Sequence, residues 1–498
     1  MTLRVYNTLS KTEELFTPVR PGKIGMYLCG PTVYKPPHIG HMVGPVIFDA
    51  IKRYLVFKGY EVTWIVNITD VDDKLIEAAA RMNTTVQELA ERCARAYMEC
   101  LNLLGIDTID RFPKASEHIP EILDICKKLI DQKQAYVADG NVWFDVATDP
   151  DYGKLSHRNV KEQESGTRTL EGSGKRHPAD FALWKTAKPG EPAWDSPWGK
   201  GRPGWHIECS AMSMKYLGNT FDIHGGGLDL LFPHHENELA QSESFTGQTF
   251  VKYWLHNGLT KVRTKSAGGQ WQSQDMHASS GNVVSAKELI EKHGPELFRY
   301  MLLTTHYRSP IDFSDDTVIA AGKGLATFTR LTERIERLLG TPVESGQADL
   351  DGIAGRLEST SAGPMVAQVI ARKMKFLEMM DSDFNTAGAI AALHEMAGDI
   401  NAYLEQNKTV PQQPEVVEAA VAGYASLRKL GRVLGLFRSA PAGGSEKEVK
   451  KLMEFLIELR DEARKNKDFA LSDRIRDGVR NIGYVLEDRG KQTEWRKL

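Results

Sequence analysis

The fold of this chain is decided around one stretch, Pro37-His38-Ile39-Gly40-His41. An apolar run, Ile24–Leu28, precedes it, and a helical pattern continues from it to about Lys58. A second apolar run follows as Val62-Thr63-Trp64-Ile65-Val66. Strand, glycine-containing loop, helix and strand form a βαβ unit, the repeating unit of a doubly wound parallel sheet. The sequence therefore predicts an α/β domain in the N-terminal part of the chain.

The start of the predicted helix suits an anionic phosphate group. A helix N-terminus offers free N–H groups and a positive potential. Gly40 lets a purine or a ribose approach the backbone, and His38 and His41 can donate to developing negative charge. The alternative is an ordinary helix N-terminus whose histidines face solvent, because His-x-Gly-His is short enough to arise by chance.

A candidate metal site comprises Cys29, Cys209, His234 and Glu238, which are far apart in the sequence. His234 and Glu238 are four residues apart, so both face the same side if a helix begins there. Two thiolates, an imidazole and a carboxylate are ligands that Zn²⁺ accepts. Taken singly, a His/Glu pair of this spacing is more often a surface pair, and a lone cysteine more often packs in a core.

Composition places the chain among ordinary globular proteins. It has 498 residues, of which 41% are hydrophobic and 26% charged, so two to four domains are expected. No apolar run is long enough to span a membrane, and the N-terminus lacks the layout of a signal peptide, which predicts a cytoplasmic protein without a membrane partner. The net charge of −3 neither supports nor excludes RNA binding.

The cysteine count argues against a disulfide framework. Five cysteines are an odd and sparse set, which is typical of a reducing compartment. Cys93, Cys100 and Cys126 lie in apolar helical patterns and are interpreted as packing residues.

Pattern changes along the chain predict its organisation. Residues 1–315 have the mixed pattern of an α/β domain, and 316–438 contain only helical patterns. The stretch 439–445 is rich in Gly, Ala and Ser and is predicted to be a linker to a compact unit at 446–498. One predicted apolar face in the helical part comprises Leu325, Phe328, Leu331, Ile335, Leu338 and Leu339.

The α/β domain is predicted to contain an insertion. Helical patterns cover about Val86–Leu104 and Ile119–Ile130, and Asp139-Gly140 predicts a β-hairpin between two short strands. The segment Pro189–Trp205, rich in Gly, Pro and Trp, is predicted to be an ordered loop that leads to Cys209.

Several longer blocks accompany Cys29 and His38-Ile39-Gly40-His41. They are Asn67–Lys74, Gly201–Cys209, Asp222–Asp229, His234–Glu238, His306–Pro310, Asp381–Thr386 and Lys467–Asp477. In this order they resemble the motifs of the cysteinyl-tRNA synthetases, a family of class I aminoacyl-tRNA synthetases, over almost the whole chain. The resemblance implies a Rossmann-like doubly wound parallel sheet with an insertion, followed by an all-α bundle and a small C-terminal unit that hold the tRNA stem and anticodon.

The same resemblance implies a function. A member of this family is a cysteine–tRNA ligase, which activates L-cysteine with ATP and Mg²⁺ to cysteinyl-adenylate and transfers the cysteinyl group to the 3′ end of tRNA(Cys). A monomer is the family expectation. The implied zinc ligands are Cys29, Cys209, His234 and Glu238. A zinc ion there would bind the substrate thiolate and reject serine, whose hydroxyl is a hard and barely acidic ligand.

Further site residues follow from the resemblance. Nucleotide contacts are implied for His38, Gly40, His41, Met276, Ser279 and Ser280. His38 and His41 are the implied catalytic residues. Thr69, Trp205 and Asp229 are candidates for positioning the amino and carboxylate groups of cysteine, although Asp in a Gly-rich turn also has a structural explanation. His224 is expected to hydrogen-bond a zinc ligand.

The second class I signature departs from the family pattern. Both of its lysines are absent, and Asp275 and Ala278 occupy their positions. One charge-assisted hydrogen bond contributes about 1.5–3 kcal/mol, so its loss slows activation by about tenfold to more than a hundredfold. Lys261, Arg263 and Lys265 alternate along a predicted strand upstream. They either compensate for the loss or form a solvated strand face.

Two alternatives to an active cysteine–tRNA ligase therefore stay open. One is a catalytically impaired paralogue, which only the degenerate second signature favours. The other is a ligase that joins activated cysteine to a small amine, although such an acceptor needs no anticodon-binding unit.

Overall fold

Four parallel strands form the sheet that the βαβ pattern predicts. In the computed structural model their order is β10 (Val251–Asn257), β9 (Phe221–Gly227), β3 (Lys23–Leu28) and β4 (Glu61–Val66). The structure describes residues 2–158, 174–265, 271–275, 285–342, 349–410, 413–438, 446–481, 484–489 and 492–497. The strands are buried along nearly their whole length, as expected for a parallel sheet.

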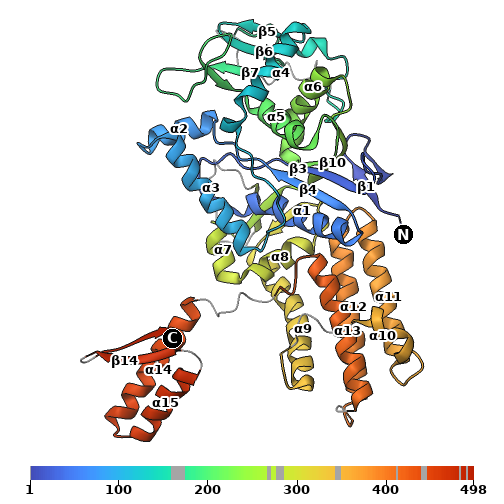
Figure 1. The fold of residues 1–498 in the computed structure, drawn as a ribbon, viewed down its shortest axis with the longest axis vertical. Coiled ribbons are helices and arrows are strands. Elements are labelled where there is room, and N and C mark those ends of the chain that lie inside the picture. The colour runs from blue at the N-terminus through green and yellow to red at the C-terminus, as the bar shows by residue number, and fades with distance from the viewer. Residues whose placement is uncertain are drawn as a thin grey trace. The chain divides into compact units, whose positions relative to one another are not determined.

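Helix α1 (Ile39–Phe57) connects β3 to β4 and completes the predicted βαβ unit (Figure 1). His38 is its N-cap, and most of its residues are buried between the sheet and the helices that follow. The helix ends where Lys58 caps it and Gly59 takes a φ of +93°, a conformation that favours glycine. The predicted helix and both flanking strands are confirmed.

The remaining elements before residue 260 lie in chain order around this sheet. They are β1 (Arg4–Asn7), β2 (Thr12–Leu15), α2 (Asp73–Arg81), α3 (Val86–Leu103), α4 (Ile119–Asp131), β5 (Ala135–Ala138), β6 (Asn141–Phe144), β7 (Phe181–Thr186), β8 (Gly201–Pro203), α5 (Trp205–Leu217) and α6 (Glu236–Thr246). The helices predicted near residues 86 and 119 are confirmed. Strands β5 to β8 form an antiparallel sheet in the order β5-β6-β7-β8, which is the predicted insertion.

The insertion contains the predicted hairpin and one departure from prediction. Asp139 and Gly140 have φ values of +51° and +75°, so this turn has the left-handed pair typical of a two-residue hairpin. The stretch predicted as a loop, Pro189–Trp205, is not a loop throughout. Gly201–Pro203 pairs with β7 as strand β8, which three residues of unremarkable strand propensity did not reveal.

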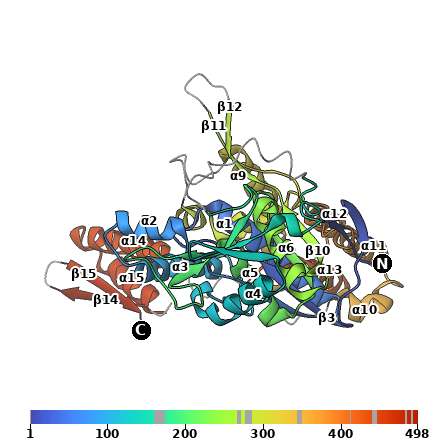
Figure 2. The ribbon, with the colours of Figure 1, turned by 90° about the horizontal axis from the view of Figure 1, so that it is seen from above.

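The chain from residue 260 to 313 adds a second small sheet. Strand β11 (Thr260–Lys265) pairs with β12 (Trp271–Asp275) and with β13 (Ile311–Phe313), and helices α7 (Ala286–His293) and α8 (Pro295–Leu303) lie between. Figure 2 shows β11 and β12 side by side. The predicted strand at residues 260–265 is confirmed.

Helices alone make up the next part of the chain. They are α9 (Asp315–Leu339), α10 (Leu350–Leu357), α11 (Gly363–Asp381), α12 (Thr386–Gln406) and α13 (Pro414–Val433). Figure 1 shows α11, α12 and α13 packed side by side. On the predicted apolar face of α9, Phe328, Leu331 and Ile335 are buried.

One hydrophobic core runs from the parallel sheet into these helices, and Met1–Phe437 form one compact unit. A second unit, Arg438–Leu498, contains α14 (Glu446–Lys465), α15 (Phe469–Asn481) and the antiparallel strands β14 (Tyr484–Arg489) and β15 (Gln492–Lys497). The predicted linker at 439–445 lies outside the described residues.

Two smaller predictions concern cysteines and membranes. All five cysteines are free, and Cys93, Cys100 and Cys126 are buried in hydrophobic cores as predicted. Among the described helices, none has the length and apolar character needed to cross a membrane.

Candidate active site

Four of the predicted site residues converge beyond the carboxyl end of the parallel sheet. Cys29 follows β3, Cys209 lies in α5, His234 lies in a π-helical turn before α6, and Glu238 lies in the first turn of α6. Their ligand atoms all lie within 4.8 Å of one another. Three of the four are buried, and Cys29 is half-buried. The predicted convergence of these residues is what the fold produces.

The distances within this cluster test whether a metal fits. Cys29 Sγ lies 3.7 Å from Cys209 Sγ and 3.5 Å from Glu238 Oε1, and Cys209 Sγ lies 3.6 Å from His234 Nε2. Tetrahedral zinc, with bonds of about 2.3 Å to sulfur and about 2.0 Å to nitrogen or oxygen, requires edges of about 3.8 Å between sulfurs and about 3.5 Å from sulfur to nitrogen or oxygen. Only the 2.8 Å ion pair between His234 and Glu238 is shorter than its tetrahedral edge of about 3.3 Å. The donor set fits Zn²⁺.

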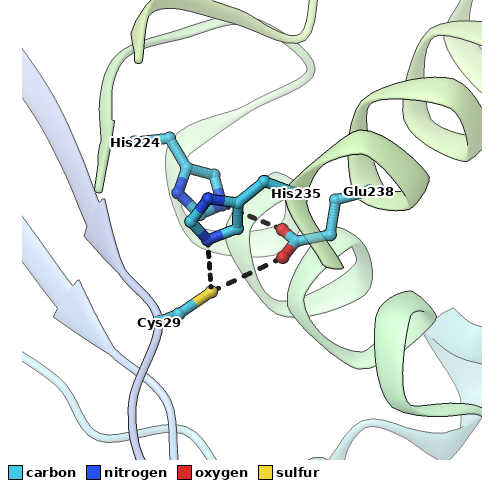
Figure 3. A group of neighbouring side chains, drawn as sticks. All are labelled: Cys29, His224, His235 and Glu238. Carbon is cyan, nitrogen blue, oxygen red and sulfur yellow. Dashed lines mark hydrogen bonds and ion pairs between the residues drawn. The ribbon is translucent and has the colours of Figure 1, made fainter. Parts of the chain in front are cut away.

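A second group of four shares two members with the first. Cys29, His224, His235 and Glu238 also have ligand atoms within 4.8 Å of one another (Figure 3). His235 Nε2 lies 3.3 Å from Cys29 Sγ, and His224 Nε2 lies 2.8 Å from Glu238 Oε2. The two imidazoles therefore contact one thiol and one carboxylate of the first group. The predicted hydrogen bond from His224 to a member of that group is present.

The protonation of the first group favours a bound cation. Burial acts to raise the pKa of the Cys209 thiol, but the Cys29 thiol and His234 outweigh it and lower that pKa to about 6. Burial likewise acts to raise the pKa of Glu238, and His224 and His234 hold it well below its usual range. A thiolate and a carboxylate thus share one buried pocket, where a divalent cation would neutralise them.

The first signature forms the N-terminus of α1. His38 Nδ1 accepts a hydrogen bond from Gly40 N at 3.2 Å, and His41 Nδ1 accepts one from His38 N at 3.3 Å. The two rings are stacked with their centroids 3.8 Å apart. Because both Nδ1 atoms are acceptors, the neutral rings carry their protons on Nε2. The pair can therefore donate two N–H groups to an anion without carrying charge.

Burial keeps both imidazoles neutral. It is the main reason that the pKa of His38 falls from 6.5 to about 4, and that the pKa of His41 falls to about 3. The nearby Lys35 ammonium lowers both further.

These two shifts predict an acid-sensitive fold. The unfolded chain protonates His38 and His41 near pH 6.5, whereas the folded chain does so only near pH 4 and pH 3. Above pH 6.5 neither state gains a proton, and as the pH falls below 6.5 the unfolded state is favoured. Replacing both residues by glutamine should therefore weaken the loss of stability between pH 7.5 and pH 5.5, measured by urea unfolding. Equal losses in the variant and the parent would contradict the two pKa shifts.

Three predicted substrate residues lie in different environments. Thr69 is buried, and its hydroxyl donates to Glu208 Oε2 at 3.1 Å. Trp205 stacks on His234 with ring centroids 4.1 Å apart, so it covers one member of the metal cluster. Asp229 is exposed in a short 3-10 helix after β9.

The second signature falls largely outside the described residues. Met276, Ser279 and Ser280 lie there, as do His277 and Ala278. The backbone on either side is described: Asp275 ends β12 opposite Lys261, and Ser285 forms a bridge with His38. The segment that carries the second signature therefore returns to the loop of the first.

Sequence reasoning missed several residues of this site. Glu208 is fully buried, its pKa is raised well above the usual range mainly by burial, and it contacts Thr69. His235 contacts Cys29 and, at 2.7 Å, His256, while His206 lies 2.9 Å from His234. The only signals in the sequence were a glutamate next to Cys209 and a histidine doublet, and neither shows which way a side chain points.

Comparisons with known proteins agree with this geometry. Family models match the tRNA synthetases class I (C) catalytic domain at residues 15–323, the DALR domain at 375–438 and the cysteinyl-tRNA ligase anticodon binding domain at 450–496. A cysteine–tRNA ligase of Syntrophotalea carbinolica is 46% identical over 511 residues, covering 100% of both chains. One of Geobacter metallireducens is 44% identical over 506 residues, again covering 100% of both.

A solved structure shares the fold. Mycobacterium tuberculosis methionyl-tRNA synthetase in complex with methionyl-adenylate superposes with a TM-score of 0.60, at 16% identity, over 84% of this chain and 94% of the other. This likeness confirms the predicted fold class, a class I synthetase α/β fold with a helical C-terminal part. On these matches, the chain belongs to the cysteine–tRNA ligase family of class I tRNA synthetases.

Proposed function

We propose that this protein activates L-cysteine with ATP and transfers the cysteinyl group to the 3′ end of tRNA(Cys). The observation that carries the proposal is the cluster of Cys29, Cys209, His234 and Glu238, whose spacing suits a thiol-selecting metal. It lies in a chain with a class I catalytic domain and an anticodon binding domain.

The metal of this site is Zn²⁺, held by Cys29, Cys209, His234 and Glu238. When bound, zinc supplies a soft Lewis acid with a preference for the deprotonated sulfur of cysteine over the hydroxyl of serine. The chain itself positions the ligands: His224 holds one carboxylate oxygen of Glu238, and His235 lies against Cys29. Such hydrogen-bond partners orient a ligand and adjust its basicity.

ATP, with Mg²⁺, binds at the start of α1. The Nε2–H groups of His38 and His41 donate to the phosphates, and Gly40 leaves room for the nucleotide. Met276, Ser279 and Ser280 complete the nucleotide site from the second signature. Because the imidazoles stay neutral, their contribution is donation of hydrogen bonds and not of charge.

The amino acid lies between the two sites. Trp205, stacked on His234, closes one side of the pocket, and Thr69 and Asp229 orient the amino and carboxylate groups. The exposed carboxylate of Asp229 has the charge that an ammonium group requires.

We assign the parts of the chain to successive tasks. Residues 1–315 activate cysteine, residues 316–438 hold the tRNA stem and anticodon side, 439–445 link, and 446–498 bind tRNA. A cytoplasmic monomer is the proposed state. The second candidate function, a catalytically impaired paralogue, is favoured by one observation, the absence of both second-signature lysines. The anticodon binding domain match disfavours a small-amine acceptor.

Cysteine-dependent ATP–pyrophosphate exchange on zinc-loaded protein, without tRNA, tests the proposal. We expect exchange with cysteine and about 10⁴-fold less with serine, because a site built around one specific bond rejects the analogue that lacks it. Zinc-loaded protein without exchange would favour the impaired paralogue. Exchange that is followed by transfer to a small amine, and not to tRNA(Cys), would favour the third reading.

A further inference from the structure

A lysine beside the first signature has no described partner. Lys35 lies three residues before His38, and its Nζ atom is buried without a hydrogen-bond partner among the residues that the structure describes. The only printed contact of this ammonium is with the Tyr34 ring, whose centroid is 5.4 Å away. An unpaired buried ammonium is costly, so this position is expected to receive an anion.

The surroundings of Lys35 are cationic or neutral donors. Its charge acts on both His38 and His41, and the Lys74 ammonium together with burial lowers the pKa of Lys35 itself. Lys35 therefore lies close to the imidazoles that are proposed to hold ATP. Two ammonium groups and two N–H donors around the N-terminus of α1 suit a polyphosphate.

The second signature returns to the same loop. Ala286 N donates to Pro37 O at 3.0 Å, and Ser285 bridges His38. The stretch that lacks both lysines, with Asp275 and Ala278 in their places, thus ends next to the loop that carries Lys35. A cation on this loop is able to serve the phosphates that the missing lysines would have served.

We propose that Lys35 is the phosphate-binding cation of adenylate formation in this enzyme, in place of the second-signature lysines. This inference rests on the proposed function. In the reaction the cysteine carboxylate oxygen bonds to the α-phosphorus, the bond from the α-phosphorus to the bridging oxygen breaks, and pyrophosphate leaves with that electron pair. The Lys35 ammonium hydrogen-bonds the phosphate oxygens where this charge develops, and no proton is transferred.

The test compares Lys35→Met and Lys35→Arg with the parent enzyme. Lys35→Met should slow cysteine-dependent ATP–pyrophosphate exchange by about ten- to a hundredfold, the effect of one charge-assisted hydrogen bond. Lys35→Arg should recover most of the rate, because it keeps the charge. Lys127→Met, at an exposed lysine in α4, is the matched control and should leave the rate unchanged.

Two further measurements separate this role from a structural one. Zinc content and the transfer of cysteine from preformed cysteinyl-adenylate to tRNA should be the same in Lys35→Met as in the parent, since neither breaks the phosphate bond. Adding Ala278→Lys to Lys35→Met should restore part of the exchange rate.

The outcomes distinguish the two proposals. A parent enzyme without exchange would sink the proposed function, and Lys35 with it. An active parent whose rate is unchanged in Lys35→Met would overturn the assignment of Lys35 alone. Loss of zinc, or an equal loss of rate in Lys35→Arg, would also overturn it, because the effect would then be structural.

Discussion

Cys209→Ala should release zinc from the purified protein and abolish the preference for cysteine over serine. The thiolate of Cys209 is the part of the cluster whose pKa lies lowest among its thiols, at about 6, so it is the sulfur most ready to bind metal near neutral pH. Without the metal, nothing in the pocket distinguishes a thiol from a hydroxyl, and a discrimination of about 10⁴-fold should fall to near one. Metal analysis and pyrophosphate exchange with each amino acid measure both effects.

The matched control is Cys126→Ala, which removes a buried thiol from a different hydrophobic core. It should keep one zinc per chain. If Cys209→Ala also keeps its zinc, the ligand assignment is wrong.

The same assay decides between the two groups of four. His234 belongs only to the first group and His235 only to the second. His234→Ala should therefore release zinc as Cys209→Ala does. His235→Ala should weaken zinc binding by about 10–100-fold, as removal of a residue that supports a ligand does. The reverse order would assign the metal to His224 and His235.

Asp49→Asn should lower the free energy of unfolding by about 3–5 kcal/mol, the usual cost of removing one partner from a buried ion pair. Asp49 in α1 is 0% exposed and forms an ion pair with Arg299 of α8, which is 1% exposed. Asp49 also accepts hydrogen bonds from Arg53 at 2.8 Å and Thr108 at 2.5 Å. Burial acts to raise the pKa of Asp49, but the two guanidinium groups keep it below its usual value.

This ion pair joins parts of the chain that are distant in sequence. Arg299 Nε donates to the carbonyl of Leu434 just after α13, so Asp49 connects the helix that begins at the first signature to the end of the helical part. Asparagine has the same shape as aspartate but leaves the Arg299 cation without its counter-charge at Asp49. Pyrophosphate exchange should therefore decline together with stability.

Urea unfolding followed by tryptophan fluorescence measures the effect, because every tryptophan except Trp495 lies in the first compact unit. The control is Asp351→Asn, which removes a carboxylate from exposed ion pairs with Lys373 and Lys429 and should cost less than about 1 kcal/mol. Similar losses in both variants would show that the buried pair contributes no more than a surface pair.

Local patterns in the sequence were sufficient for the elements of the fold. The βαβ unit around His38-Ile39-Gly40-His41, the hairpin at Asp139-Gly140 and the helix capped by Thr85 each depend on residues close in the chain, whose propensity and periodicity act locally. Strand β8 was missed because its pairing with β7 is a contact between segments, which three residues do not encode.

The candidate site divides in the same way. Residue types and motif order in the sequence determined which residues belong together: two cysteines, a histidine and a glutamate for zinc, and two histidines for a phosphate. Only the tertiary structure decided that His224 and His235 share Cys29 and Glu238, that Trp205 stacks on His234, and that Lys35 lies unpaired beside the first signature. Side-chain direction and burial depend on how distant segments pack, and these set both the metal distances and the pKa values of the buried groups.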